Sequence, residues 1–222
     1  MLNGNALKLI AAFTMLLDHI GYILFPGVLW LRIVGRLAFP IYAFMIAEGC
    51  KYTRSKKRYL SLIALLAAIY QIVYYIFDGS LYFSILTTFS LSILTIYAMD
   101  QVKENPRPAA FWILWGAVIG VWWLNRTFTI DYGFWGCMAP VFAALPSKTK
   151  YDRPVFRVAA LGAGLLLLCM ESSFIQPYSL LALPLLLCYN GKRGKWNMKY
   201  FFYIFYPVHL VILEGIAILI KN

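Results

Sequence analysis

Charged side chains are scarce in this chain. Only 13% of its 222 residues are charged, with 9 acidic residues and 2 histidines, whereas 62% are hydrophobic. A soluble domain carries about 25% charged residues, so this chain has too few to cover a surface that faces water. The scarcity excludes an ordinary soluble fold and predicts a protein embedded in a lipid bilayer. We expect residues 1–222 to form a single integral-membrane domain.

Several chemistry-bearing motifs are also missing. The four cysteines are scattered without metal-site spacing, so we interpret them as packing residues and predict no metal ion. Neither a phosphate-binding glycine loop nor a nucleophile elbow is present. The abundant tyrosine and tryptophan residues suit membrane interfaces better than a base-stacking surface. The sequence therefore predicts membrane lipids as partners and no nucleic acid.

Long hydrophobic runs fill the sequence between turn-forming or charged clusters. A helix needs roughly 20 residues to cross a bilayer, and most of the runs are near that length. They predict an all-α, polytopic helical bundle of about nine transmembrane helices, with a range of eight to ten. The fifth, sixth and eighth runs are short, and the range allows for a re-entrant or strongly kinked form of either of the latter two. The runs are 6–25, 28–49, 59–77, 83–99, 109–124, 131–145, 154–170, 177–189 and 200–220.

The net charge of +11 is unevenly distributed. Lysine and arginine gather at 51–58, 146–157 and 190–199, and the connections between these stretches hold few. Cytoplasmic loops are the ones rich in Lys and Arg, so the pattern predicts a cytoplasmic N-terminus and, with nine spans, a C-terminus outside. The basic loops serve either topology and contact with anionic lipid or the docking of a polyanionic cofactor.

A few ionisable residues lie inside the hydrophobic runs. Asp18 and His19 are in the first run, Arg32 and Arg36 in the second, and His209 in the last. Such groups are costly at membrane depth and mark a functional-site candidate by default. The turn between the first two runs is short, so the two helices are antiparallel neighbours. We expect the first four of these residues to meet in the outer half of the membrane.

Two interpretations of this cluster remain open at the level of sequence. In the first, a salt bridge from Asp18 to Arg36 or Arg32 only holds the two helices together, which leaves His19 unexplained. In the second, the cluster is a functional site. Neighbouring residues point about 100° apart on a helix. We therefore expect Asp18 to hold an arginine and His19 to face a cavity.

Two prolines lie close to these residues. Pro40 removes the backbone hydrogen bond to the carbonyl of Arg36, which predicts a bend there. Pro207 predicts a kink in the last run near His209, with Tyr206 lining the same cavity. A single histidine on an apolar helix is either a packing residue or a functional one, and the sequence leaves both open for His209.

The two ends of the chain resemble the TraX family, whose namesake acetylates a conjugative pilin. The resemblance is dense over about the first 60 residues and the last 25 and weak between them. It covers the segments NGNALKLIAAFTMLLDHIGYILFP, LRIVGRLAFPIYAFMIAEGCKYTRSKKRYL and FFYIFYPVHLVIL. The shared pattern is Lys8, Asp18-His19, Arg32, Arg36, Phe39-Pro40, Ala47-Glu48-Gly49 and Tyr206-Pro207 with His209. The family is in turn similar to the wider group of transmembrane acyltransferases.

The resemblance implies transfer of an acetyl group from cytosolic acetyl-coenzyme A to an amine or hydroxyl of an acceptor at or across the membrane. A pilin-like protein N-terminus is one such acceptor, but the acceptor and the oligomeric state stay open. The alternative from a different class is a secondary transporter or proton-coupled carrier, because intramembrane Asp, His and Arg also build proton relays. A third alternative is a structural partner in an envelope assembly.

On the acetyltransferase hypothesis, the catalytic residues are His19, Asp18, Arg36 and His209. His19 is the candidate general base, with an acetyl-histidine intermediate as a variant of the same role. Asp18 holds an arginine, and Arg36 stabilises the oxyanion. His209 acts as a second base or polarises the carbonyl.

The candidate residues for binding acetyl-coenzyme A are Arg32, Arg36, Lys8 and Tyr206. The two arginines suit phosphate recognition as well as oxyanion stabilisation. Lys8 and the basic loops are expected to hold the nucleotide end of coenzyme A.

Overall fold

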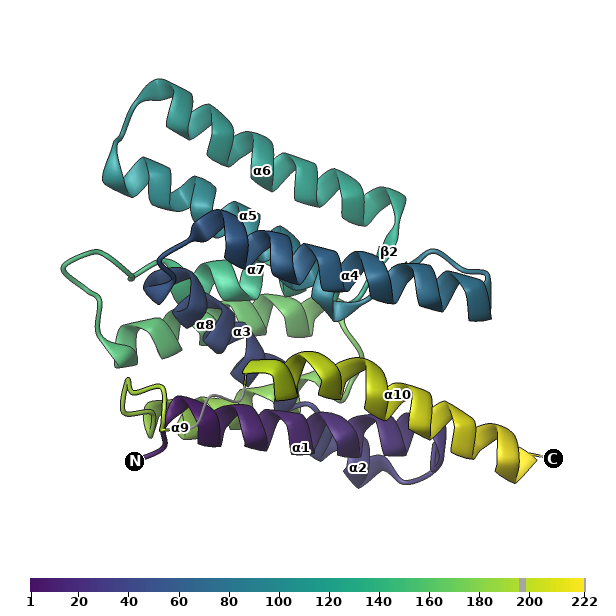
Figure 1. The fold of residues 1–222 in the computed structure, drawn as a ribbon. Helices are drawn as coiled ribbons and strands as arrows, with labels where there is room; N and C mark the ends of the chain where they lie inside the picture. Colours follow the sequence, from purple (N-terminus) through teal and green to yellow (C-terminus); the bar gives the residue numbers. More distant parts are fainter. Residues whose placement is uncertain (196–198, 222) are drawn as a thin grey trace. The chain divides into compact units, whose positions relative to one another are not determined.

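The computed structural model describes residues 1–195 and 199–221, without the side chains of 77, 78, 199–203 and 221. In this part of the chain nearly all regular structure is helical (Figure 1), which confirms the all-α class. The chain divides into two compact units. Unit 1 comprises Met1–Met45 and Glu171–Asn222, and unit 2 comprises Ile46–Met170. The expectation of a single domain over 1–222 stays a prediction.

Unit 1 is built around its first helix. Helix α1 begins where the Asn3 side chain accepts a hydrogen bond from the backbone N–H of Ala6, which is the usual role of an N-cap. It packs against α2 and α10, and η1 packs against α2. The elements are α1 (Gly4–Ile23), α2 (Leu29–Gly35), the start of α3 (Ala38–Tyr52), the 3₁₀ helix η1 (Gln176–Leu181), α9 (Ala182–Leu187) and α10 (Lys199–Lys221).

The second hydrophobic run folds as two helices. Helix α2 ends at Gly35 and α3 begins at Ala38, so the interruption falls at Arg36 and Leu37. Pro40 has no N–H to donate to the carbonyl of Arg36, and the chain turns at that carbonyl. The predicted bend is confirmed and takes the form of a break.

The N-terminus is joined to the segment after α9 by backbone hydrogen bonds. Leu2 donates to the carbonyl of Cys188 and accepts from the N–H of Asn190, and Gly4 donates to the carbonyl of Lys192. These bonds satisfy N–H groups at the start of α1 that have no partner within the helix. They fix the basic segment around Lys192 beside the beginning of α1.

Unit 2 is centred on α5, which packs against α4, α6 and α7. Helix α4 ends at Gly79, whose φ of 71° is the left-handed conformation that glycine adopts most easily at a helix end. The elements are the rest of α3, α4 (Lys56–Asp78), β1 (Tyr82–Phe83), α5 (Ile85–Glu104), α6 (Pro108–Thr127), β2 (Thr129–Ile130), α7 (Gly133–Ala144) and α8 (Pro154–Glu171). Strands β1 and β2 pair in parallel.

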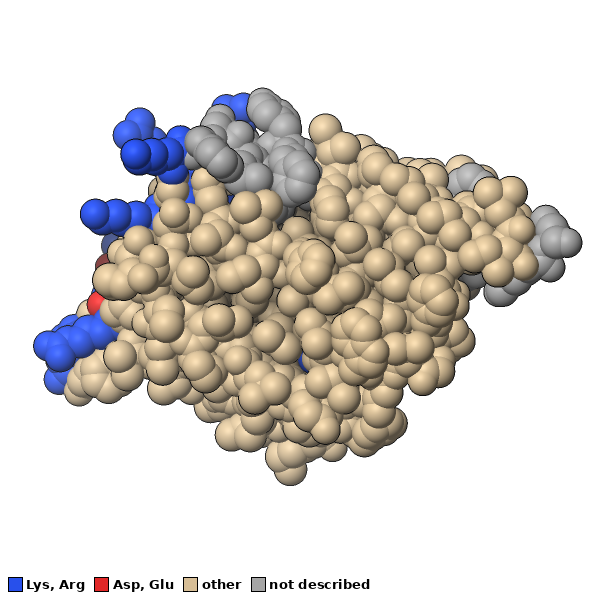
Figure 2. All heavy atoms as spheres, turned by 90° about the horizontal axis from the view of Figure 1, so that it is seen from below, with Lys and Arg blue, Asp and Glu red and all other residues tan. Residues whose placement is uncertain are grey.

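Six helical segments of the described chain are long and apolar enough to cross a bilayer. Large hydrophobic side chains are exposed on α4, α6 and α10, including Trp112, which is 76% exposed. Most of the face drawn in Figure 2 is free of charged side chains. These features are those of a multi-pass membrane protein.

The count of nine spans stays a prediction. The six are Gly4–Ile23, Leu29–Tyr52, Lys56–Ile76, Ile85–Glu104, Pro108–Thr127 and Pro154–Glu171.

Candidate functional site

Asp18 of α1 lies between two arginines of the neighbouring segment. Its Oδ2 is 2.6 Å from Nη2 of Arg36 and 3.1 Å from Nη1 of Arg32. Arg32 also donates to the backbone carbonyl of Asp18, with an N–O distance of 3.3 Å. Asp18 and Arg36 are each 8% exposed. The prediction that Asp18 holds an arginine is confirmed, and it holds both.

Glycines allow α1 and α2 to approach closely enough for this contact. A Cβ placed on Gly35 would overlap the side chain of Asp18, and one on Gly21 would lie 2.8 Å from Cβ of Leu31. Small residues at a helix interface let the two backbones come together in this way. The position of the Asp18 carboxylate therefore depends on the absence of a side chain at residue 35.

Gly35→Ala is expected to push α1 and α2 apart and to lower the unfolding free energy by about 1–3 kcal/mol, the usual cost of overpacking. Thermal unfolding in detergent measures the effect. Gly116→Ala on α6 is the matched control, because a Cβ there meets no atom within 4 Å. An unfolding temperature for Gly35→Ala as high as that of the control would contradict the role assigned to Gly35.

The cluster carries more positive than negative charge. Arg32 and Arg36 contribute two cations, and Asp18 is the only anion that contacts them among the described ion pairs. The guanidinium of Arg32 also lies 5.0 Å from the ring centroid of Tyr22, which partly compensates that cation. In these pairs two arginines share one carboxylate, and such a concentration of positive charge suits an oxygen that gains negative charge.

The two histidines of the chain are in contact. Nδ1 of His19 on α1 is 3.0 Å from Nε2 of His209 on α10, and the ring centroids are 4.9 Å apart. His209 is 5% exposed. His19 also interacts electrostatically with Asp18 and Arg32, so the dyad and the arginine cluster belong to one site. Both histidines were candidates from the sequence, but their mutual contact was not predicted.

The hydrogen-bond network assigns the ring protons of the neutral dyad. Nδ1 of His209 is 2.7 Å from the carbonyl oxygen of Phe205, and a carbonyl only accepts, so this nitrogen carries a proton. Nε2 of His209 is then the acceptor, and Nδ1 of His19 donates to it. Nε2 of His19 is left with a lone pair, and no described residue donates a hydrogen bond to it. His19 is thereby set up to accept a proton at Nε2.

Aromatic side chains fix the His209 ring. Phe205 stacks on it at a centroid distance of 4.9 Å, and the Tyr206 ring meets it edge-on at 6.0 Å. Tyr206 is half-buried beside the dyad. Phe205 was not named from the sequence, although its position four residues before His209 places it on the same helix face.

Gln176 of η1 is a further polar residue at the site. Its Oε1 accepts a hydrogen bond of 3.5 Å from Nη1 of Arg36, and the residue is 2% exposed. Gln176 could not be predicted from the sequence, because it stands alone at the edge of an apolar run and is 140 residues from Arg36.

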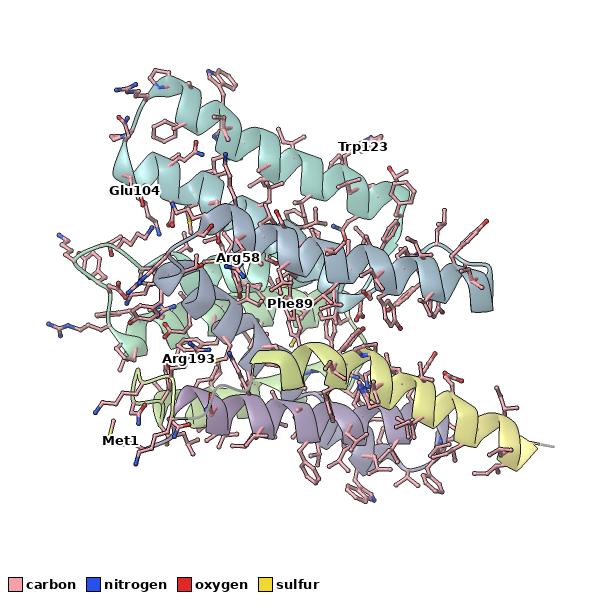
Figure 3. The ribbon with its side chains drawn as sticks, in the orientation of Figure 1. Met1, Arg58, Phe89, Glu104, Trp123 and Arg193 are labelled. Carbon is pink, nitrogen blue, oxygen red and sulfur yellow. The ribbon has the colours of Figure 1, made fainter. Side chains whose placement is uncertain are left out.

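Lys8 lies apart from the cluster. It precedes Asp18 by ten residues on α1, which is about 15 Å at the rise of an α-helix. Lys8 instead interacts electrostatically with Arg193. Met1 and Arg193 lie at the same end of α1 (Figure 3), so Lys8 belongs with the basic segment at the start of the helix.

A hollow of about 730 Å³ lies at this end of unit 1. Its size falls within the range of about 300–1,000 Å³ that is common for small-molecule sites. Three cations and three asparagines are among the residues that line it. The lining residues are Asn3, Asn5, Ala6, Leu9, Asn190, Lys192, Arg193, Gly194 and Lys195.

Unit 2 has ion pairs of its own. Arg157 of α8 pairs with Glu48 of α3, and both side chains are almost fully buried. Lys51 pairs with Asp152 in the loop before α8, with an N–O distance of 2.9 Å. Burial alone raises the pKa of the Asp152 carboxyl, but hydrogen bonds from the Lys148 N–H and from Lys51 hold that pKa below its ordinary value. These pairs tie elements of unit 2 together.

Comparison with known proteins identifies the family. The family described as TraX protein matches residues 3–217, so the chain belongs to the TraX family. The chain is 28% identical to the probable fimbrial assembly protein FimC, serogroup H1, of Dichelobacter nodosus, over 93% of this chain and 92% of that protein. It is 33% identical to an uncharacterized protein, RP591, of Rickettsia prowazekii (strain Madrid E), over 58% of this chain and 50% of the relative. No solved structure matches significantly.

Proposed function

We propose that this protein is an integral-membrane acetyltransferase, which moves an acetyl group from cytosolic acetyl-coenzyme A to an amine or hydroxyl of an acceptor at or across the membrane. Membership in the TraX family supports the proposal. The observation that carries it is the histidine dyad, which leaves Nε2 of His19 as a base beside two arginines that share one carboxylate. Acetyl transfer requires a base for the acceptor and positive charge for the oxyanion.

Each residue of the site has its own role in the proposed reaction. Nε2 of His19 takes the proton of the acceptor N–H or O–H as the acceptor heteroatom bonds to the thioester carbon. The electron pair of the carbonyl double bond moves onto oxygen, and the Arg32 and Arg36 cations stabilise that oxyanion. When the carbonyl re-forms, the C–S bond breaks and the leaving thiolate takes the proton from His19. The products are the acetylated acceptor and coenzyme A with a free thiol.

His209 supports this cycle by holding the ring of His19. While His19 is protonated, its Nδ1–H still donates to Nε2 of His209, and the Phe205 carbonyl keeps His209 in the accepting tautomer. The dyad thus stabilises the imidazolium without taking the proton itself, in the manner of the orienting partner in other catalytic dyads and triads.

The hollow at the start of α1 suits the nucleotide end of the donor. Lys192, Arg193 and Lys195 supply positive charge for its phosphates, with Lys8 nearby. The distance from Asn5 to His19 along α1 is about 21 Å at 1.5 Å per residue, and coenzyme A carries its thioester at the end of a long flexible arm. In this arrangement the basic segment and the N-terminus face the cytoplasm, and an odd number of spans places the C-terminus outside.

The similarity to a probable fimbrial assembly protein supports a pilin-like acceptor. A pilin-like N-terminus presents an amine, which meets the requirement for a nucleophile with a transferable proton. A hydroxyl on a membrane-bound acceptor fits the same chemistry.

Binding of acetyl-coenzyme A to the purified protein in detergent, followed by calorimetry, tests the donor site. We expect specific binding that weakens about tenfold or more in Lys192→Ala/Arg193→Ala, since each charge-assisted hydrogen bond contributes about 1.5–3 kcal/mol. Arg107→Ala/Arg126→Ala removes two exposed positive charges of unit 2 that lie outside the three basic stretches and is the control. No binding by the folded protein, together with substrate flux in liposomes without chemical change, would instead favour the carrier alternative.

A further inference from the structure

Two buried polar side chains of η1 have hydrogen-bonding groups that no described residue satisfies. Gln176 is 2% exposed and Ser179 is 0% exposed. The Gln176 Nε2 and Ser179 Oγ atoms have no hydrogen-bond partner within the described part of the chain. A 3₁₀ helix has three residues per turn, so side chains at i and i+3 lie on the same face. One buried face of η1 therefore presents both groups.

The contact with Arg36 fixes the orientation of the Gln176 amide. A guanidinium only donates, so the amide oxygen faces Nη1 of Arg36, and the NH₂ group points away from it. Helix η1 packs against α2, and Arg36 is the C-cap residue of α2. The Gln176 amide is thus bonded to Arg36 through its oxygen, and its NH₂ group, on the same amide carbon, is a second donor next to the guanidinium.

A buried donor without an acceptor destabilises a folded protein by about 1–3 kcal/mol, and each such group in a native structure requires an explanation. Here two unsatisfied groups share one face of η1, and one of them belongs to a side chain that is bonded to Arg36. Donors and a cation together suit an oxygen atom that bears or gains negative charge. The carbonyl oxygen of a thioester is such an atom, because it becomes an oxyanion during acyl transfer.

We propose that Gln176 and Ser179 bind the carbonyl oxygen of the acyl group on the donor. This inference rests on the proposed function and adds two hydrogen-bond donors to the arginines that stabilise the oxyanion there. As the acceptor bonds to the carbonyl carbon, the π electron pair moves to this oxygen, and the hydrogen bonds from the amide and the hydroxyl strengthen. When the C–S bond breaks, the pair returns to the carbonyl and the hydrogen bonds weaken again.

Comparison of two ligands tests the inference. Acetyl-coenzyme A carries the carbonyl, and coenzyme A with a free thiol lacks it, so the ratio of their affinities isolates the carbonyl contact. In Gln176→Met and Ser179→Ala, affinity for acetyl-coenzyme A is expected to fall about 3- to 10-fold, the range of one neutral hydrogen bond, with less than about twofold change for coenzyme A. Ser173→Ala, which removes an exposed hydroxyl just before η1, is the control and should change neither.

The outcomes separate this inference from the function on which it rests. If the wild-type protein binds neither ligand, both fail. If it binds both and the two variants leave the affinity ratio unchanged, or weaken both ligands equally, only the role of Gln176 and Ser179 is overturned. Thermal unfolding of the ligand-free protein provides a second readout. Since the Ser179 hydroxyl has no described partner, Ser179→Ala should unfold at the same temperature as the wild type or higher.

Discussion

Replacement of His19 by alanine is expected to abolish acetyl transfer while leaving the fold intact. His19 is half-buried, and its ring contacts the ring of His209, so its removal costs little packing. Loss of a general base slows a reaction by about 10²- to 10⁴-fold. The measurement is incorporation of labelled acetyl groups from acetyl-coenzyme A into acceptors in membranes that contain the variant, with thermal unfolding as the check on folding.

Two companion variants show whether the effect is chemical. Phe13→Ala removes a 60% exposed apolar side chain from the same helix and should leave transfer unchanged. His209→Ala removes the partner that orients His19 but leaves Nε2 of His19 in place, so a smaller loss is expected. Transfer by His19→Ala at a rate close to wild type would exclude His19 as the essential base, whatever the behaviour of His209→Ala.

The second large effect is expected from Arg36→Ala. Asp18 is buried and loses its nearest cation in this variant. Removal of one partner of a buried ion pair destabilises a protein by about 3–5 kcal/mol. Arg32 remains 3.1 Å from Asp18, so we expect a value near the lower end of that range, measured by denaturant or thermal unfolding in detergent. Acetyl transfer should be lost, and binding of acetyl-coenzyme A weakened, even at temperatures where the variant stays folded.

Arg157→Ala is the matched control for this variant. Arg157 and Glu48 form a buried pair in unit 2, so the loss of stability should be similar, but the folded protein should still bind acetyl-coenzyme A. Arg36→Lys keeps a cation for Asp18 and removes the contact of Nη1 with Gln176, so it should restore most of the stability and little of the activity. Equal loss of binding in the Arg36 and Arg157 variants would contradict a specific role for Arg36.

Much of the fold and part of the site could be predicted from the sequence. Hydrophobic runs predicted the all-α class, and Pro40 predicted the interruption that the structure places at Arg36. The short turn after the first run predicted that Asp18 would meet Arg32 and Arg36. These successes share a cause, because each depends on residues close together in the chain, where helix geometry and proline chemistry act directly.

The sequence by itself determined that the chain belongs in a membrane, that it is helical, and which ionisable residues its apolar segments carry. Only the tertiary structure decided that His19 meets His209 across 190 residues and that Gln176 meets Arg36. Such contacts depend on how far each helix is rotated about its axis and which neighbour it packs against. In a chain that is apolar on nearly every face, hydrophobic periodicity leaves that rotation open. The rotation of each helix about its axis is decided instead by close packing at glycines and by the hydrogen bonds of a few buried polar groups.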